Sequence, residues 1–180
     1  GRQDRLAVGG PAGAKRLLVR YNYGFLVYDL SSPAAPQKVL QKDLRAPDGY
    51  PVAGDGQTRA GMLASSSDGA RALVPWGAGG FGTIVMSGMS YSGGGEYAPS
   101  GETVKMTAAL KAGNRYLAFS STSGGELWVS DLTTVQGDVK ADQANQNQIG
   151  SWQYLGPNFG GPVSILKVVE SAPRAYLVAA

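Results

Sequence analysis

The apolar residues of this chain are grouped in short runs, and each run is followed by a turn rich in glycine, serine or proline. Residues 16–21 and 25–28 show the pattern, because both runs are nearly continuous in apolar residues and only a short turn at Asn22 separates them. Runs of this kind are typical of strands that are buried on both faces of a sheet. No window of about 12 residues keeps the apolar spacing of a helix. The pattern therefore predicts an all-β chain.

Four of the runs follow a turn and begin with an arginine. They start at Arg16, Arg71, Arg115 and Arg174, at spacings of 55, 44 and 59 residues. These spacings are close to the period of one four-stranded blade of a β-propeller. We therefore expect about three and a half four-stranded antiparallel blades in a single segment that spans residues 1–180. The expected blades are residues 1–45, 59–106 and 107–156, followed by a half-blade at 162–180.

The half-blade predicts an exposed edge strand. A propeller protects its strand edges by closing into a ring, and known rings have roughly four to eight blades. We expect this chain to form an incomplete propeller, whose ring is completed by another protein chain or by the remainder of the propeller. A self-contained β-sandwich or barrel is the alternative fold. The predicted pairing residues are Arg174, Ala175, Tyr176, Leu177 and Val178.

Local sequence distinguishes the outer strand and the turns of a blade. Residues 38–42 mix lysine and glutamine with apolar residues, which is typical of an edge strand exposed on one side. The third strands of the first and third units end in Asp29-Leu30-Ser31 and Asp131-Leu132-Thr133. An aspartate at this position can accept a hydrogen bond from the backbone N–H two residues later. We interpret both aspartates as turn residues and not as catalytic or metal-binding groups.

These residues carry a resemblance to a known repeat. Leu17-Leu18-Val19, followed by residues 25–36 with the sequence Phe-Leu-Val-Tyr-Asp-Leu-Ser-Ser-Pro-Ala-Ala-Pro, resembles the LVIVD-type β-propeller repeat of bacterial surface and periplasmic proteins. The likeness covers residues 15–45 and 113–134. It implies a propeller fold and an extracytoplasmic location, in the periplasm or at the bacterial cell surface. It implies no activity, because propellers have many functions.

Composition narrows the chemistry that the chain can perform. It contains no cysteine and no histidine, which excludes disulfides, thiolate metal sites and catalysis by a Ser-His or Cys-His pair within the chain. The 27 glycines and ten prolines are consistent with many tight turns. The net charge is only +3, and the basic residues form no run of the kind that binds nucleic acid. No apolar stretch reaches the ~18–20 residues that span a membrane. We expect no cofactor, no metal and no nucleic-acid partner.

One segment imitates a catalytic motif. Residues 81–94 read as a strand followed by Gly-x-Ser-x-Ser-Gly around Ser90, which resembles the nucleophile elbow of α/β-hydrolases. The glycine that should close the motif is Ser92, glycines follow where a helix should begin, and the chain has no histidine base. Ser87 lies as far from Arg71 as Asp131 lies from Arg115, so the repeat interprets residues 87–89 as a turn. We therefore predict no catalytic residue.

Acidic residues in two other segments suggest calcium only weakly. The pairs Asp48 with Asp55 and Asp138 with Asp142 lack the density of acidic residues that a dedicated calcium loop has. We interpret them as solvated loop residues.

Propeller geometry places two sets of loops on one face, namely those between second and third strands and those between successive blades. Aromatic and amide side chains gathered there suit a protein or carbohydrate ligand, although bulky residues also fill the gaps between blades. We expect a non-catalytic scaffold or recognition segment of an exported bacterial protein, which mediates protein–protein assembly. Two alternatives stay open: part of a propeller enzyme with catalytic residues elsewhere, and a carbohydrate-binding β-domain. The candidate binding residues are Tyr21, Asn22, Tyr23, Tyr50, Trp76, Phe81, Asn158 and Phe159.

Overall fold

The described part of the chain consists of strands and turns. The computed structural model describes residues 6–10, 13–21, 24–43, 64–66, 68–75, 81–86, 90–92, 104–133, 153–156 and 158–180. Within these ranges all regular elements are β-strands, and they form three four-stranded sheets and one two-stranded hairpin. All neighbouring strands are antiparallel, and the described sheets are open at both edges. The predicted all-β class is therefore confirmed.

In each sheet the strands follow one another in chain order. The first sheet contains β1 (Leu6–Gly9), β2 (Arg16–Tyr21), β3 (Gly24–Asp29) and β4 (Gln37–Asp43). The second contains β5 (Ala64–Ser65), β6 (Arg71–Pro75), β7 (Phe81–Val85) and β8 (Ser90–Ser92). The third contains β9 (Val104–Ala112), β10 (Arg115–Thr122), β11 (Leu127–Asp131) and β12 (Gln153–Tyr154). The hairpin consists of β13 (Leu166–Ser171) and β14 (Arg174–Ala179).

The four arginines of the sequence repeat occupy one structural position. Each begins the second strand of its sheet, namely β2, β6, β10 and β14. The predicted period therefore corresponds to a repeated antiparallel sheet. The third sheet starts with β9 at Val104, shortly before the expected start of the third unit at residue 107.

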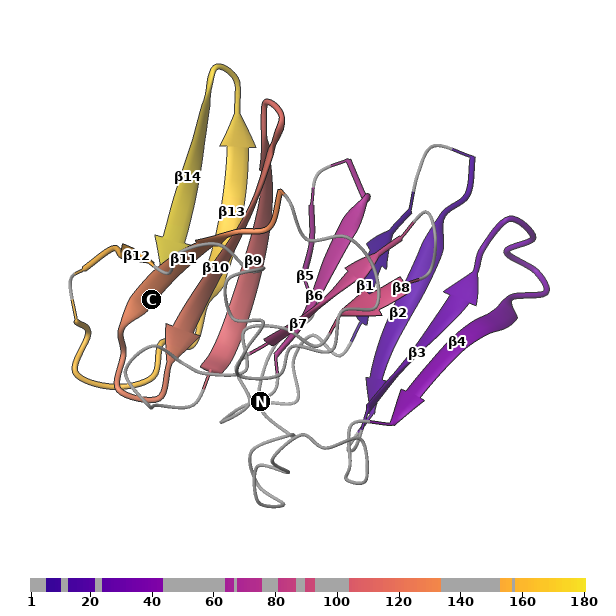
Figure 1. The fold of residues 1–180 in the computed structure, drawn as a ribbon, viewed down its shortest axis with the longest axis horizontal. Helices are drawn as coiled ribbons and strands as arrows, with labels where there is room; N and C mark the ends of the chain where they lie inside the picture. Colours follow the sequence, from indigo (N-terminus) through magenta and orange to yellow (C-terminus); the bar gives the residue numbers. More distant parts are fainter. Residues whose placement is uncertain are drawn as a thin grey trace.

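The sheets are stacked in sequence order. Figure 1 shows them in a row, from the first sheet in indigo to the hairpin in yellow. The first strands of successive sheets are neighbours, since β1 contacts β5, β5 contacts β9, and β9 contacts β13. Strand β6 also contacts β9. Each sheet thus lies against the next, and only the two outer faces of the stack have no neighbouring sheet among the described residues.

Three apolar clusters fill the spaces between the sheets. In β6, Ala72 and Val74 pack toward the first sheet, whereas Leu73 between them packs toward the third sheet. All three side chains are fully buried, so β6 is buried on both faces. The sequence predicted such burial for residues 16–21 and 25–28, but among the described residues β2 and β3 have a neighbouring sheet on one face only, because the first sheet stands at the end of the stack. The first cluster is Leu18, Phe25, Val27, Ala72, Val74, Ile84 and Met86. The second is Leu73, Ala109, Ala118 and Leu132, and the third is Met106, Ala108, Leu127, Val163 and Leu166.

The predicted aspartate turns are confirmed. The Ser31 N–H donates to Asp29 Oδ1 at 2.7 Å, and the Thr133 N–H donates to Asp131 Oδ1 at 2.9 Å. The first of these hydrogen bonds lowers the pKa of Asp29 below its usual value. The same carboxylates pair with the arginines of the repeat, at 3.7 Å for Arg16 with Asp29 and 2.9 Å for Arg115 with Asp131. Each aspartate therefore fixes a turn and also links the second and third strands.

A polar cluster joins the second and third sheets. The Tyr116 hydroxyl donates to Asp68 Oδ2 at 2.7 Å, and Lys111 Nζ lies 3.3 Å from the same oxygen. The Arg71 guanidinium lies 5.2 Å from the centre of the Tyr116 ring, within the range of a cation–π contact. Partial burial alone would raise the pKa of Asp68, but hydrogen bonds from the Ala70 N–H, Ser66 and Tyr116 lower it to about 2. The carboxylate is therefore held charged between the two sheets.

Two glycines allow backbones to approach closely at the sheet junctions. Gly69 has a φ of +68°, and a Cβ atom there would lie 2.4 Å from the Gly10 carbonyl oxygen. The Gly10 N–H donates to the Gly69 oxygen at 2.6 Å, which ties the first sheet to the second. Gly125, which follows β10, allows an equally close approach, since a Cβ atom there would lie 2.4 Å from the Gly161 carbonyl oxygen. A side chain at either position would force the two segments apart.

Candidate interaction surface

The last strand of each sheet is an edge, and the four edges differ in length and composition. Strand β4 carries lysines and glutamines, and its register with β3 shifts at Val27 and Tyr28. Within the described ranges, β8 and β12 have three and two residues. Lysines, bulges and shortness all protect an edge against unwanted strand pairing. Strand β14 has six residues, Arg-Ala-Tyr-Leu-Val-Ala, and pairs with β13 in one unbroken register.

The register shows which backbone groups of β14 point outward. Ile165 and Ala180 exchange two hydrogen bonds, Ile165 N–H to Ala180 oxygen at 3.0 Å and the reverse at 3.1 Å. In an antiparallel pair such doubly bonded positions alternate with unbonded ones. Val178, Tyr176 and Arg174 therefore bond to β13, whereas the N–H and C=O groups of Ala175, Leu177 and Ala179 point to the opposite edge. No described strand pairs with that edge.

The two faces of the hairpin differ in the same alternating way. Leu177 and Ala179 pack against the third sheet, together with Leu166 and Val168. The opposite face, which we call the hairpin outer face, is exposed and carries four apolar residues around Lys167. The apolar residues are Ile165, Val169, Tyr176 and Val178, which are 48, 43, 50 and 42% exposed. Strand β14 therefore has both an edge without a described partner strand and an exposed face with several apolar side chains.

The other end of the stack also has an apolar face without a described neighbour. Ala7, Leu18 and Val27 pack toward the second sheet. The residues between them in each strand point away from it, and Leu6 is 58% exposed. We call these residues the first-sheet outer face. They are Leu6, Val8, Leu17, Val19, Leu26 and Tyr28, which are brought together by the pairing of β1, β2 and β3.

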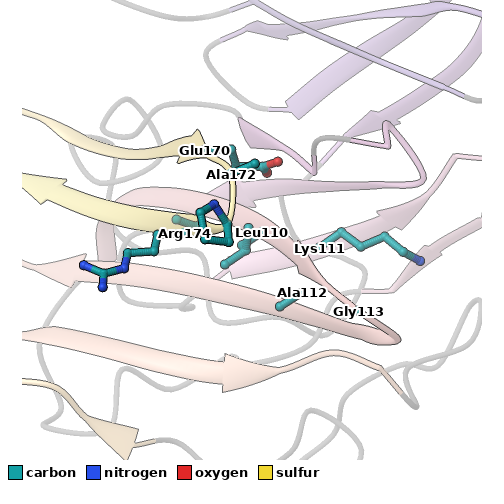
Figure 2. Close-up of a pocket in the computed structure, with 9 residues that line it drawn as sticks. Leu110, Lys111, Ala112, Gly113, Glu170, Ala172 and Arg174 are labelled. Atoms are coloured by element: carbon teal, nitrogen blue, oxygen red, sulfur yellow. The ribbon is translucent and has the colours of Figure 1, made fainter.

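A pocket of about 650 Å³ lies between the tips of the β9–β10 and β13–β14 hairpins. Figure 2 shows its charged side chains, with Lys111 and Arg174 extending in opposite directions. Glu170 lies on a third side. Because these charges diverge, the pocket has no convergent set of polar groups of the kind that orients a small ligand.

Part of the predicted aromatic surface can be placed. Asn158 and Phe159 lie on the loop before the hairpin, where Phe159 is 45% exposed. Asn158 Oδ1 accepts a hydrogen bond from the Gly160 N–H at 2.7 Å, so its side chain stabilises its own loop. The Phe159 N–H donates to the Gly125 oxygen at 3.1 Å. This loop therefore lies against the β10–β11 loop.

The remaining residues of that surface stay a prediction. Tyr21 ends β2 and Phe81 begins β7, but their side chains lie outside the described part of the structure. Four further candidates lie outside the described residues altogether, namely Asn22, Tyr23, Tyr50 and Trp76. The acidic pairs considered for calcium also lie outside it, at Asp48, Asp55, Asp138 and Asp142.

The serine of the hydrolase-like motif lies in a strand. Ser90 begins β8 and pairs with Val85 of β7, so the segment forms a β-hairpin and not the strand-to-helix turn of a nucleophile elbow. Among the described residues, no group of three or more carboxylates could hold a metal ion. The described ranges also contain no helix that is long and apolar enough to cross a membrane.

Comparison with known proteins adds no family. No family model matches the chain, and no curated protein is detectably similar to it in sequence. The class that the fold itself defines is a stack of repeated antiparallel β-sheets. The likeness to LVIVD-type repeats stays a prediction.

The sequence predicts one feature of this surface and gives no sign of the others. Strand β14 could be found from the repeat, because it is the fourth run headed by an arginine. The sequence has no signal for the exposure of Val169 in β13 or of Ile165 just before it, since apolar runs look the same whether a neighbouring sheet covers them or not. The contact of Asp68 with Tyr116 had none either, because it depends on how two separate sheets stack.

Proposed function

We propose that the chain is a non-catalytic β-propeller segment that serves as an assembly scaffold, and that the open edge of β14 takes up a strand from another protein chain. The propeller is supported by the stacking of repeated four-stranded antiparallel sheets whose first strands are neighbours. Blades of a propeller are four-stranded sheets arranged around a common centre. The resemblance to LVIVD-type repeats supports an extracytoplasmic setting in bacteria.

The observation that carries the assembly role is the contrast between β14 and the other three outer strands. Unpaired N–H and C=O groups on a long, regular strand form a template for another strand. Main-chain hydrogen bonds then give affinity, and the alternate side chains give specificity. In β14 these outward groups belong to Ala175, Leu177 and Ala179, and the strand has no bulge, no lysine and no proline of its own.

Hydrogen–deuterium exchange on the assembly isolated from its cells tests this proposal. We expect the peptide that covers residues 174–180 to exchange slowly at the outward amides as well as at the amides bonded to β13. The peptide that covers residues 37–43 is the matched control, because β4 is an outer strand with a lysine-rich edge. Fast exchange at Ala175, Leu177 and Ala179 in the native assembly would contradict strand addition at β14.

A further inference from the structure

We infer that a small carboxylate anion binds between the second and third sheets, where the side chains of Arg71 in β6 and Thr83 in β7 hold it. This site lies inside the stack, with a described sheet on either side of it. It is separate from the edge of β14, so it goes beyond the strand addition proposed above.

In the first and third sheets the repeat arginine has a carboxylate partner. Arg16 stands directly opposite Asp29 in the pairing of β2 with β3, and the two side chains lie 3.7 Å apart. Arg115 pairs with Asp131 at 2.9 Å. In the register of β10 with β11, Asp131 stands opposite Leu117, so it is a diagonal neighbour of Arg115. The arginine therefore receives its carboxylate from the third strand, from either the opposite or the diagonal position.

In the second sheet neither of these two positions carries a charge. Val85 stands directly opposite Arg71, and Thr83 stands opposite Leu73 and is the diagonal neighbour of Arg71. Opposite residues of an antiparallel pair share a face of the sheet, and diagonal neighbours lie ~7–8 Å apart. Since Leu73 packs against the third sheet, Arg71, Thr83 and Val85 face that sheet too. Arg71 thus lacks the carboxylate that the repeat supplies elsewhere.

Both Arg71 and Thr83 have buried polar atoms without a partner. Arg71 is only 8% exposed, and its Nη1 atom is enclosed and has no hydrogen-bond partner. Burial lowers the pKa of this guanidinium below its usual value. Thr83 is fully buried, and its Oγ1 atom also has no partner. Burying polar groups without hydrogen bonds is costly, most of all for a charged group. A bound anion would remove this cost at both residues.

Asp68 acts on Arg71 electrostatically, but its oxygens are already engaged by other groups. Its Oδ1 accepts two hydrogen bonds from its own turn, at 2.7 and 3.0 Å. Its Oδ2 accepts one from the Tyr116 hydroxyl and pairs with Lys111. A carboxylate has about four acceptor positions, so Asp68 has none left for Arg71. Arg71, Lys111 and Asp68 together carry one net positive charge, which a single monoanion balances.

A carboxylate suits the donors that face this space. A guanidinium donates to both oxygens of a carboxylate, and a threonine hydroxyl can donate one further hydrogen bond. Because Arg71 Nη1 and Thr83 Oγ1 are enclosed, the ligand is small, of the size of acetate. The polar cluster reaches solvent at Lys111 and Asp68, whose side chains are 34 and 32% exposed. The anion therefore enters at this side of the junction.

Thermal unfolding of the full chain in sodium acetate tests the site, with sodium chloride at equal ionic strength as the reference. A ligand that binds only the folded state raises the unfolding temperature. At ten times its dissociation constant, acetate should raise this temperature by about 3–5 °C relative to chloride. Saturation-transfer NMR on the acetate methyl group measures binding directly.

Val85→Asp supplies the missing carboxylate at the position directly opposite Arg71. Val85 is partly exposed, so the new carboxylate is not placed in a closed apolar core. We expect this variant to fold and to lose the acetate response, because its own carboxylate then occupies Arg71. Circular dichroism establishes that the variant is folded.

Two further variants test the role of the hydroxyl and the specificity of the response. Thr83→Val removes the hydroxyl and keeps the shape of the side chain, so it should stay folded and bind acetate several-fold more weakly. Arg115→Gln is the matched control, since it removes a repeat arginine that already has a partner in Asp131. This variant should respond to acetate as the unsubstituted chain does.

Two results would overturn the inference. One is an equal acetate response in Val85→Asp and the unsubstituted chain, because a general effect of the salt acts on both. The other is the absence of saturation transfer to acetate in the unsubstituted chain. Neither result affects hydrogen exchange at the β14 edge, so the failure of this site and the failure of the proposed strand addition are distinguishable.

Discussion

Strands β6 and β14 hold the same place in their sheets, but β6 is buried on both faces and β14 on only one. Their sequences begin alike, as Arg-Ala-Leu-Val and Arg-Ala-Tyr-Leu. Leu73 of β6 is fully buried between two sheets, whereas the equivalent Tyr176 of β14 is half exposed. The difference arises from the place of the strand in the stack and not from its own pattern. An apolar position in this repeat is a core residue only where a second sheet lies against it.

The largest expected effect comes from truncating these two equivalent side chains. Leu73→Ala should lower the free energy of unfolding by about 2–5 kcal/mol, because it leaves a cavity between the second and third sheets. Tyr176→Ala should cost less than about 1 kcal/mol in dilute, monomeric protein, since the side chain is half in solvent. Urea unfolding of both variants measures the difference. Equal losses would mean that the hairpin outer face is covered within a single chain.

Two glycines extend the comparison to the turns. Gly69→Ala should cost about 2–3 kcal/mol, because the new Cβ adopts a positive φ and also meets the Gly10 carbonyl oxygen at the junction of two sheets. Gly113, in the turn between β9 and β10, has a φ of +59° but has nothing within 4 Å of its Cβ position. Gly113→Ala is therefore the matched control and should cost about 1 kcal/mol. Similar unfolding midpoints for the two variants would contradict a tight contact at the first junction.

The polar cluster between the second and third sheets predicts a pH dependence. The pKa of Asp68 is lowered from 3.8 to about 2, so its stabilising contribution is fully present above its unfolded pKa and is lost as the pH falls through its folded pKa. With allowance for solvent screening of this partly exposed group, Asp68→Asn should cost about 1 kcal/mol at neutral pH. The difference from the unsubstituted chain should shrink between pH 4 and pH 2. A stability difference that does not change with pH would contradict this role of Asp68.

The sequence predicted the local structure better than the relations between sheets. Arginine at 16, 71, 115 and 174 located four second strands, because an apolar run after a turn forms a strand wherever it lies. The turns at Asp29 and Asp131 were predicted for a similar reason, since the side chain bonds to its own neighbours in the chain. The partners of Asp68 and the exposure of Tyr176 depend on which sheet lies opposite. The sequence of a single strand does not determine its neighbouring sheet.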